Sequence, residues 1–221
     1  MSIIKKLTPE FEIVEKLETI RYLEHGWPTA LCRWHLHEEY ELHLILETSG
    51  KTFVGDYVGQ FTPGSLFLTG PRLPHNWVTE ESETESVPLR DMLIQFNHDT
   101  IVKAFEAFPE LSELNYLLDV ARSGIEFKNY DPEVAKSYLT SIRDSSGMTR
   151  IMNFLLFLQE LNEWKQKVSL SLTQLNPSLS SASQDRVNEV VNYVIDNYKS
   201  NISLSDVASI ASMSEIGRAH V

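Results

Sequence analysis

Short apolar runs separated by turn residues fill the chain from residue 30 to residue 97. The pairs Ser49-Gly50, Pro63-Gly64 and Gly70-Pro71 supply turn signals between these runs. Many short β-prone runs at near-regular spacing predict an all-β barrel or sandwich for this part of the chain. The predicted strands are Leu42 to Leu46, Thr52 to Val54, Ser65 to Thr69 and Leu89 to Phe96.

The apolar spacing becomes helical between residues 98 and 168. Apolar residues recur three and four positions apart, which places them on one face of an α-helix. Gly124 is expected to end the first helix, and Asp131 followed by Pro132 is typical of the start of the second. The three predicted helices carry the apolar sets Leu111, Leu114, Leu117, Leu118 and Ala121; Val134, Tyr138, Leu139 and Ile142; and Ile151, Phe154, Leu155, Leu158 and Leu161.

The pattern breaks at residues 169–185, SLSLTQLNPSLSSASQD, where serine, asparagine and proline predominate and charge is almost absent. This composition predicts a linker. Beyond it, an apolar face from Asp185 to Tyr198 predicts another helix. Ser203 and Asp206 then fit a capping box at the start of a short helix, in which the small Ala208 allows close packing.

Charge and cysteine content narrow the possible partners and compartment. The formal net charge is -12 and the longest basic cluster is Lys5-Lys6, so the residues present do not form a complete nucleic-acid-binding surface. The single cysteine, Cys32, excludes an internal disulfide and is expected in the core of a cytoplasmic protein. No apolar run approaches the roughly 18 residues of a membrane span, and MSIIKKLTPEF has no signal-peptide core, so no membrane partner is expected.

The segment Trp34 to Leu44, WHLHEEYELHL, has two interpretations. Apolar and polar residues alternate along it, as in a half-buried strand whose histidines and glutamates face water. Alternatively, His35 and His37 project from one face, close enough to bind one ion, and Glu41 follows four positions later.

A later histidine extends the second interpretation into a candidate metal site. His75 follows the turn residues of PGSLFLTGPRLPHNW, and the separation of about thirty residues between the two halves of the pattern leaves room for two strands. Three imidazoles and one carboxylate, His35, His37, His75 and Glu41, suit one divalent transition metal (Zn, Mn, Fe or Ni) with a position left open for water or a ligand. His43 is expected to be a pocket or surface residue and not a ligand.

These motifs resemble those of a known family. The H-x-H-x3-E pattern and the later G-P-x-x-P-H resemble the two halves of the cupin motif, although Thr79 stands where the strict enzyme pattern has asparagine. Residues 34–77 as a whole resemble the sensor domain of AraC-type transcriptional regulators. Residues 186–214, RVNEVVNYVIDNYKSNISLSDVASIASMS, resemble the opening of that family's DNA-binding domain.

The resemblance implies an α+β fold, mainly β and then α, in five parts. These are a cupin sensor barrel with an N-terminal arm at 1–97, a helical dimerisation region at 98–168, the linker at 169–185, an incomplete helix-turn-helix at 186–214, and a tail at 215–221. The tail is expected to be non-native, because EIGRAHV resembles a sequencing adapter read in frame. The natural chain is then expected to continue beyond Ser214 into a recognition helix.

The function implied is that of a ligand-responsive, DNA-binding transcription regulator and not an enzyme. Its expected partners are a small-molecule effector, such as a sugar or small acid, a second copy of the chain, and DNA in the full-length protein only. The effector pocket is expected to include Trp34, Phe53, Phe67, Trp77 and Arg72, although the aromatic residues also suit plain core. The scaffold of the first helix-turn-helix is assigned to Ser203, Leu204, Ala208 and Ser214.

Two other functional classes remain open at this point. One is a metal-dependent cupin enzyme of the dioxygenase or isomerase type, because such enzymes share the three-histidine, one-glutamate set. The other is a cupin binding module with an incidental helical tail. Residues 186–214 discriminate among the three, since cupin enzymes rarely carry a linker followed by the start of a helix-turn-helix.

Overall fold

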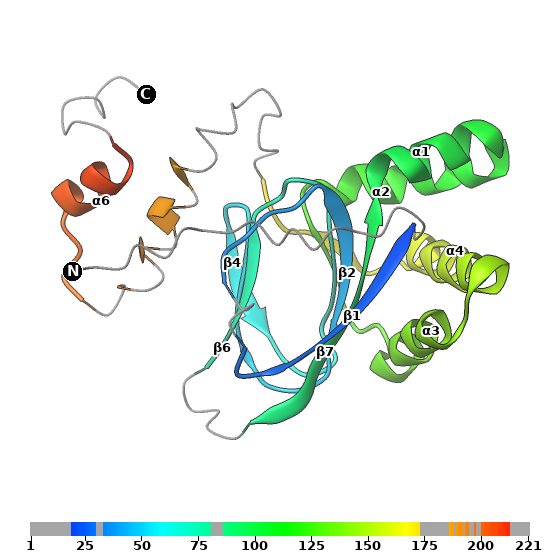
Figure 1. The fold of residues 1–221 in the computed structure, drawn as a ribbon, viewed down its shortest axis with the longest axis horizontal. Coiled ribbons are helices and arrows are strands. Elements are labelled where there is room, and N and C mark those ends of the chain that lie inside the picture. Colours follow the sequence, from blue (N-terminus) through cyan, green and yellow to red (C-terminus); the bar gives the residue numbers. More distant parts are fainter. Residues whose placement is uncertain are drawn as a thin grey trace.

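The fold of the chain is α+β, with a sheet-rich N-terminal part followed by helices (Figure 1). The computed structural model describes residues 19–29, 33–80, 86–172 and 186–212, except positions 188, 192, 195, 196, 198 and 199. The predictions for Cys32, for Ser214 and for the tail therefore lie outside the described residues. No helix among the described residues has both the length and the apolar character needed to cross a membrane.

Nine described strands form two sheets. The larger has the order β1 (Ile20–Trp27), β7 (Val87–Asn97), β2 (Glu39–Ile45), β5 (Leu66–Thr69), β8 (Ile125–Phe127) and β9 (Lys167–Ser169). The smaller has the order β4 (Tyr57–Phe61), β3 (Gly50–Val54) and β6 (His75–Thr79). Their ladders are antiparallel. The sheets face each other as an open, barrel-like pair (Figure 1), and an isolated bridge between His35 and His75 joins the segment before β2 to β6.

The helices follow the sheets in sequence. They are α1 (His98–Ala107), the 3-10 helix η1 (Pro109–Leu114), α2 (Asn115–Ala121), α3 (Pro132–Asp144), α4 (Gly147–Glu163) and α6 (Leu204–Ile210). The first predicted helix is therefore divided between η1 and α2. The predicted start of α3 is confirmed, because the Asp131 side chain accepts a hydrogen bond from the backbone N–H of Glu133.

Two apolar clusters lie on opposite faces of the larger sheet. The outer face of β2 contributes Tyr40, Leu42 and Leu44 to a cluster shared with α1 to α4. The inner face, toward the smaller sheet, contributes Ile45 to a second cluster that includes Phe67 and Trp77. Because helices cover one face of β2 and the smaller sheet covers the other, both of its faces are buried.

This double burial corrects the interpretation in which the polar side of Trp34 to Leu44 faces water. Glu41 and His43 are only 3% and 4% exposed, and they point between the sheets. The predicted linker also begins within the fold, because Ser169 ends β9 and both Leu170 and Ser171 are buried. Residues 173–185 lie outside the described part of the chain.

Candidate metal centre

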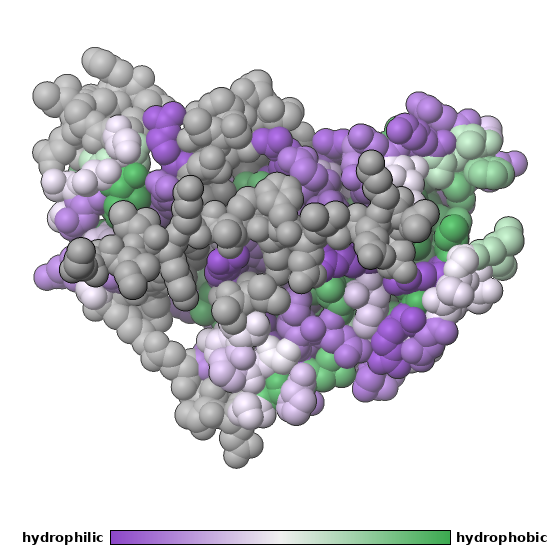
Figure 2. Space-filling view, in the orientation of Figure 1, coloured by the Kyte–Doolittle hydropathy of each residue, from purple (hydrophilic) through white to green (hydrophobic). Residues whose placement is uncertain are grey.

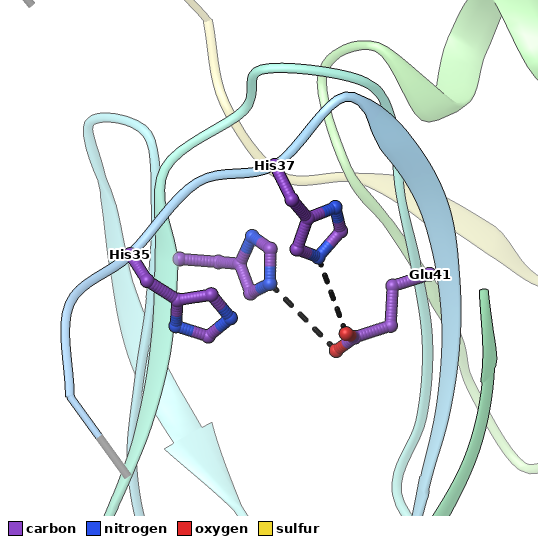
Figure 3. A group of neighbouring side chains, drawn as sticks. His35, His37 and Glu41 are labelled. Atoms are coloured by element: carbon purple, nitrogen blue, oxygen red, sulfur yellow. Dashed lines mark hydrogen bonds and ion pairs between the residues drawn. The ribbon is translucent and has the colours of Figure 1, made fainter. Parts of the chain in front are cut away.

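Four side chains predicted to bind a metal converge between the two sheets. His35, His37, Glu41 and His75 each offer one ligand atom, and these atoms all lie within 4.8 Å of one another. Nε2 of His37 is 3.2 Å from Oε2 of Glu41 (Figure 3). Nε2 of His75 is 3.7 Å from Oε1 of Glu41. Metal–ligand bonds of about 2.1 Å at right angles separate neighbouring ligand atoms by about 3.0 Å, so the cluster has the dimensions of a single-ion site.

The backbone brings the histidine-bearing segments together. The isolated bridge forms two hydrogen bonds, His35 N–H to the His75 carbonyl at 3.2 Å and His75 N–H to the His35 carbonyl at 2.9 Å. Arg72 N–H also donates to the His37 carbonyl at 2.7 Å. The turn before β6 is thereby fixed against the segment before β2, which places the rings of His35 and His75 4.4 Å apart.

Each of the three imidazoles is oriented by a carbonyl group close by in sequence. Nδ1 lies 2.8 Å from the Arg33 carbonyl oxygen in His35, 3.0 Å from that of Glu39 in His37, and 2.7 Å from that of Leu73 in His75. A carbonyl oxygen only accepts, so each Nδ1 carries the proton in the neutral ring. Nε2 is then the atom available to a metal. Burial lowers the pKa of His37, but its contact with Glu41 raises the pKa above its usual value, so this ring would release its Nε2 proton when a metal binds.

The electrostatic state of the cluster suits a divalent ion. Burial and the neighbouring His75 lower the pKa of His35 to about 3, which keeps its ring neutral. Burial alone would raise the pKa of Glu41, but the neighbouring His37, His43 and His75 hold it well below its usual range. Nε2 of His75 is buried and has no hydrogen-bond partner among the described residues. An ionised carboxylate and an unpaired buried nitrogen fit a bound cation.

Sequence reasoning missed the residues that support Glu41. Gln95 on β7 donates from Nε2 to Oε2 of Glu41 at 3.0 Å, and Nδ1 of His43 lies 2.9 Å from Oε1. Asp91 on β7 places Oδ2 3.2 Å from Nε2 of His43, and its Oδ1 is 3.0 Å from Nδ1 of His25. The sequence did contain a signal for Gln95 and Asp91. Both lie on β7 and alternate with the buried apolar residues Met92, Ile94 and Phe96.

Of the predicted effector-pocket residues, Phe67 and Trp77 lie on the faces of the two sheets that are turned toward each other. Their ring centroids are 5.6 Å apart, and the Trp77 ring is 5.1 Å from that of His75. Trp34 is buried, while Phe53 is half-buried and alternates with the inward-facing residues of β3. Arg72 is not brought to the cluster, since its guanidinium donates to Glu38 at 3.1 Å.

The predicted helix-turn-helix scaffold is described only in part. Ser203 caps α6, and its side chain and that of Asp206 form the predicted reciprocal capping box. Ala208 is buried, whereas Leu204 is 65% exposed. Residues described between 186 and 197 are helical, as expected for the preceding helix.

Comparisons with known proteins give distant structural likenesses. No family model and no curated protein matches the sequence. The solved structures similar to this chain include ToxT from Vibrio cholerae O395, at 8% identity over 90% of this chain and 73% of ToxT, with a TM-score of 0.39. They also include the AraC-like transcriptional activator CuxR, at 8% identity over 87% of this chain and 64% of CuxR, with a TM-score of 0.40.

A cupin enzyme is similar over a smaller part of the chain. Oxalate decarboxylase from Bacillus subtilis, a protein with Mn(II) centres, is 21% identical over 30% of this chain and 17% of its own, with a TM-score of 0.24. The ToxT structure contains a bound (E)-4-(8-methylnaphthalen-1-yl)but-3-enoic acid. These three likenesses have identities below 25% and TM-scores below 0.5. A function is therefore assigned to the chain from the residues of its own site.

Proposed function

We propose that this chain is the sensing part of a ligand-responsive transcription regulator and that its facing sheets hold one divalent transition metal. The observation that carries the proposal is the convergence of the three histidines and Glu41, with every Nδ1 bonded to a backbone carbonyl. In this arrangement three Nε2 atoms and one carboxylate point toward a common position between the sheets. Preoriented imidazoles of this kind are typical of metal ligands.

The metal would supply a Lewis-acidic coordination position for an oxygen donor of the effector. His35, His37, His75 and Glu41 would hold it, with Zn, Mn, Fe and Ni as the candidate ions. Trp77 adds an indole N–H that is buried without a hydrogen-bond partner among the described residues. This donor and the neighbouring metal suit a sugar or small acid, which offers several oxygen atoms.

The regulatory part of the proposal depends on the C-terminal helices. The capping box of α6 and the buried Ala208 match the resemblance to the first helix-turn-helix of AraC-type regulators. α6 contains no lysine or arginine, as its sequence LSDVASI shows. In this proposal α6 is a supporting helix, and DNA binding belongs to the full-length protein.

A homodimer is the proposed assembly. Met148, Ile151, Met152 and Leu156 on α4 are between 45% and 78% exposed. Their spacing places them on one face of the helix, and hydrophobic residues are visible where α1 and α4 project from the sheets (Figure 2). A second copy of the chain would cover this face.

A metal-dependent cupin enzyme is the second candidate, because the same ligand set serves such enzymes. One observation weighs against it. Thr79, which stands at the position of the asparagine in the enzyme pattern, bonds through its hydroxyl to that of Thr48 at 3.1 Å. We therefore propose that the chain is not an enzyme.

Metal analysis of the purified chain tests the proposal. After reconstitution with Zn, Mn, Fe(II) or Ni and removal of excess ion, wild type is expected to retain about one metal per chain. His37→Ala and His75→Ala should lose it, while His98→Gln, which changes a histidine outside the cluster, should keep it. Circular dichroism verifies that each variant is folded. Wild type without stoichiometric metal under all four conditions would refute the metal centre.

A further inference from the structure

A groove of about 380 Å³ lies outside the sheets, where helices α1 and α2 meet the outer face of β2. Its polar side is formed by Tyr40 from β2, His98 from α1, and Arg122 at the end of α2. Its apolar side includes Leu118, which is buried, and Tyr116, which is 67% exposed. It is built from a different face of β2 than the metal centre.

The hydrogen-bonding geometry fixes the state of His98. Nε2 of His98 lies 3.4 Å from Nη2 of Arg122, and Nδ1 lies 3.1 Å from the hydroxyl of Tyr40. Arginine only donates, so Nε2 must be the accepting, proton-free atom. Nδ1 therefore carries the proton and donates to the Tyr40 hydroxyl. In this state His98 is neutral, and its ring nitrogen is a weak acceptor for an arginine.

We propose that this groove binds a small carboxylate that carries an aromatic or aliphatic body. A carboxylate offers Arg122 a charged, two-oxygen acceptor in place of a neutral ring nitrogen, and such pairs are stronger and better oriented. It also allows His98 to become an imidazolium that donates from Nε2. The body of the ligand would then lie against Leu118 and Tyr116.

Charged groups around the groove determine how the affinity for a carboxylate depends on pH. Burial and the neighbouring Arg122 lower the pKa of His98 in the free protein. The groups facing it are Tyr40 from β2, Arg122 and Asp119 from α2, and Asp99 on its own helix. A bound carboxylate adds a negative charge beside the imidazole and raises its pKa. Binding is therefore accompanied by proton uptake, and affinity increases as pH falls.

Asp119 carries a negative charge at the groove and therefore disfavours the binding of an anion there. Its Oδ1 is 3.9 Å from Nε of Arg122, and its side chain is 78% exposed, so the pair is loose. A ligand carboxylate competes with Asp119 for the same guanidinium. Removing the carboxylate of Asp119 is therefore expected to strengthen ligand binding. The proposal then predicts one substitution that raises affinity as well as substitutions that lower it.

Titration with 3-phenylpropanoate tests the proposal, monitored by NMR of the histidine side-chain nitrogens. The free protein should show His98 protonated at Nδ1, and saturation should convert it to imidazolium. Arg122→Gln should weaken binding about tenfold or more, and Asp119→Asn should strengthen it severalfold. Arg143→Gln is the matched control, because Arg143 lies on α3 and is 42% exposed against 43% for Arg122.

The comparison ligand is 3-phenylpropanamide, which has the same body without the charge and should bind at least about tenfold more weakly. Equal affinity for amide and carboxylate, an unchanged affinity in Arg122→Gln, or no saturable binding would overturn the proposal. His37→Ala should bind 3-phenylpropanoate as wild type does. This inference and the metal centre can therefore fail independently.

Discussion

At the residue scale, Glu41 is the side chain on which the candidate metal centre depends. It is 3% exposed, and its two oxygens are contacted by His37, His43 and Gln95. An ionised carboxylate in such a position is stable only because every contact opposes its charge or donates a hydrogen bond. Its loss therefore affects the metal-free fold as well as metal binding.

We expect Glu41→Gln to lower the free energy of unfolding of the metal-free protein by about 2–4 kcal/mol, because the histidines lose a charged acceptor in a buried site. Urea denaturation measures the effect. Glu39→Gln is the control, since the Glu39 side chain is 26% exposed and its loss should cost less than about 0.5 kcal/mol. Equal effects of the two substitutions would contradict this account of Glu41.

His43 gives a pH dependence with a definite sign. Burial alone lowers its pKa, but Asp91 and Glu41 outweigh burial and raise the pKa to about 9. The folded state thus holds a proton more tightly than the unfolded state. The resulting stability is fully present below about pH 6.5 and is lost as pH rises through 9.

Urea denaturation of the metal-free protein should accordingly show stability falling by on the order of 2 kcal/mol between pH 6.5 and 9.5. In His43→Gln that decline should be much smaller. The same decline in wild type and variant would show that another group produces it.

The four candidate ligands could be found from sequence because their spacing is characteristic, whereas their supports could not. Gln95 lies directly opposite Glu41 in the β2–β7 ladder, although 54 positions separate them along the chain. The alternation along β7 shows that Gln95 and Asp91 share a face. Only the register between β2 and β7 shows which residues of the neighbouring strand lie beside Gln95 and Asp91 on that face.

At the scale of elements, the short strands β8 and β9 and the burial of β2 are the features that the local sequence pattern does not reveal. β8 and β9 have three residues each, too few to show a period, and they form where chain segments return to the edge of β5. β2 shows the alternation of a strand with one wet face, yet helices and the smaller sheet cover both faces. Burial of the second face depends on tertiary packing and not on the strand's own sequence.

Gly70 marks the place where the end of β5 meets the end of α2. A Cβ added there would lie 2.7 Å from Cα of Arg122 and 2.8 Å from the carbonyl oxygen of Ala121. Backbone atoms cannot move aside as a side chain can, so we expect Gly70→Ala to destabilise the protein by about 2 kcal/mol. Thermal or urea unfolding measures this.

Gly59→Ala is the control for that substitution. The nearest atoms to its added Cβ belong to the Tyr57 side chain, which can rotate away. We expect a cost well below that of Gly70→Ala. The reverse order would show that the contact between β5 and α2 is not the constraint described.

At the scale of the whole molecule, the two proposed sites share β2 but use its opposite faces. Tyr40 points to the helices and the groove, while Glu41 points to the metal centre. Likewise His98 follows directly on β7, the strand that carries Gln95. Adjacent residues on β2, and residues three positions apart at the end of β7, therefore link the helical layer to the candidate metal centre.

The exposed apolar face of α4 leads to the last prediction, which concerns assembly. Soluble monomers rarely expose several large apolar residues side by side, because each costs hydration free energy that burial removes. Met148, Met152 and Leu156 recur every four positions and so form a continuous stripe on one helix. We expect sedimentation equilibrium of the wild-type chain at micromolar concentration to show a dimer.

A lysine in this stripe would place an unpaired charge in the contact, so Met152→Lys should shift the equilibrium to monomer by about 2 kcal/mol or more, roughly a thirtyfold weaker association. Ser137→Lys, on the exposed surface of α3, adds the same charge outside the stripe and should leave the dimer unchanged. A monomeric wild type, or equal weakening by both lysines, would exclude α4 as the contact. The apolar stripe would then require a partner other than a second copy of the chain.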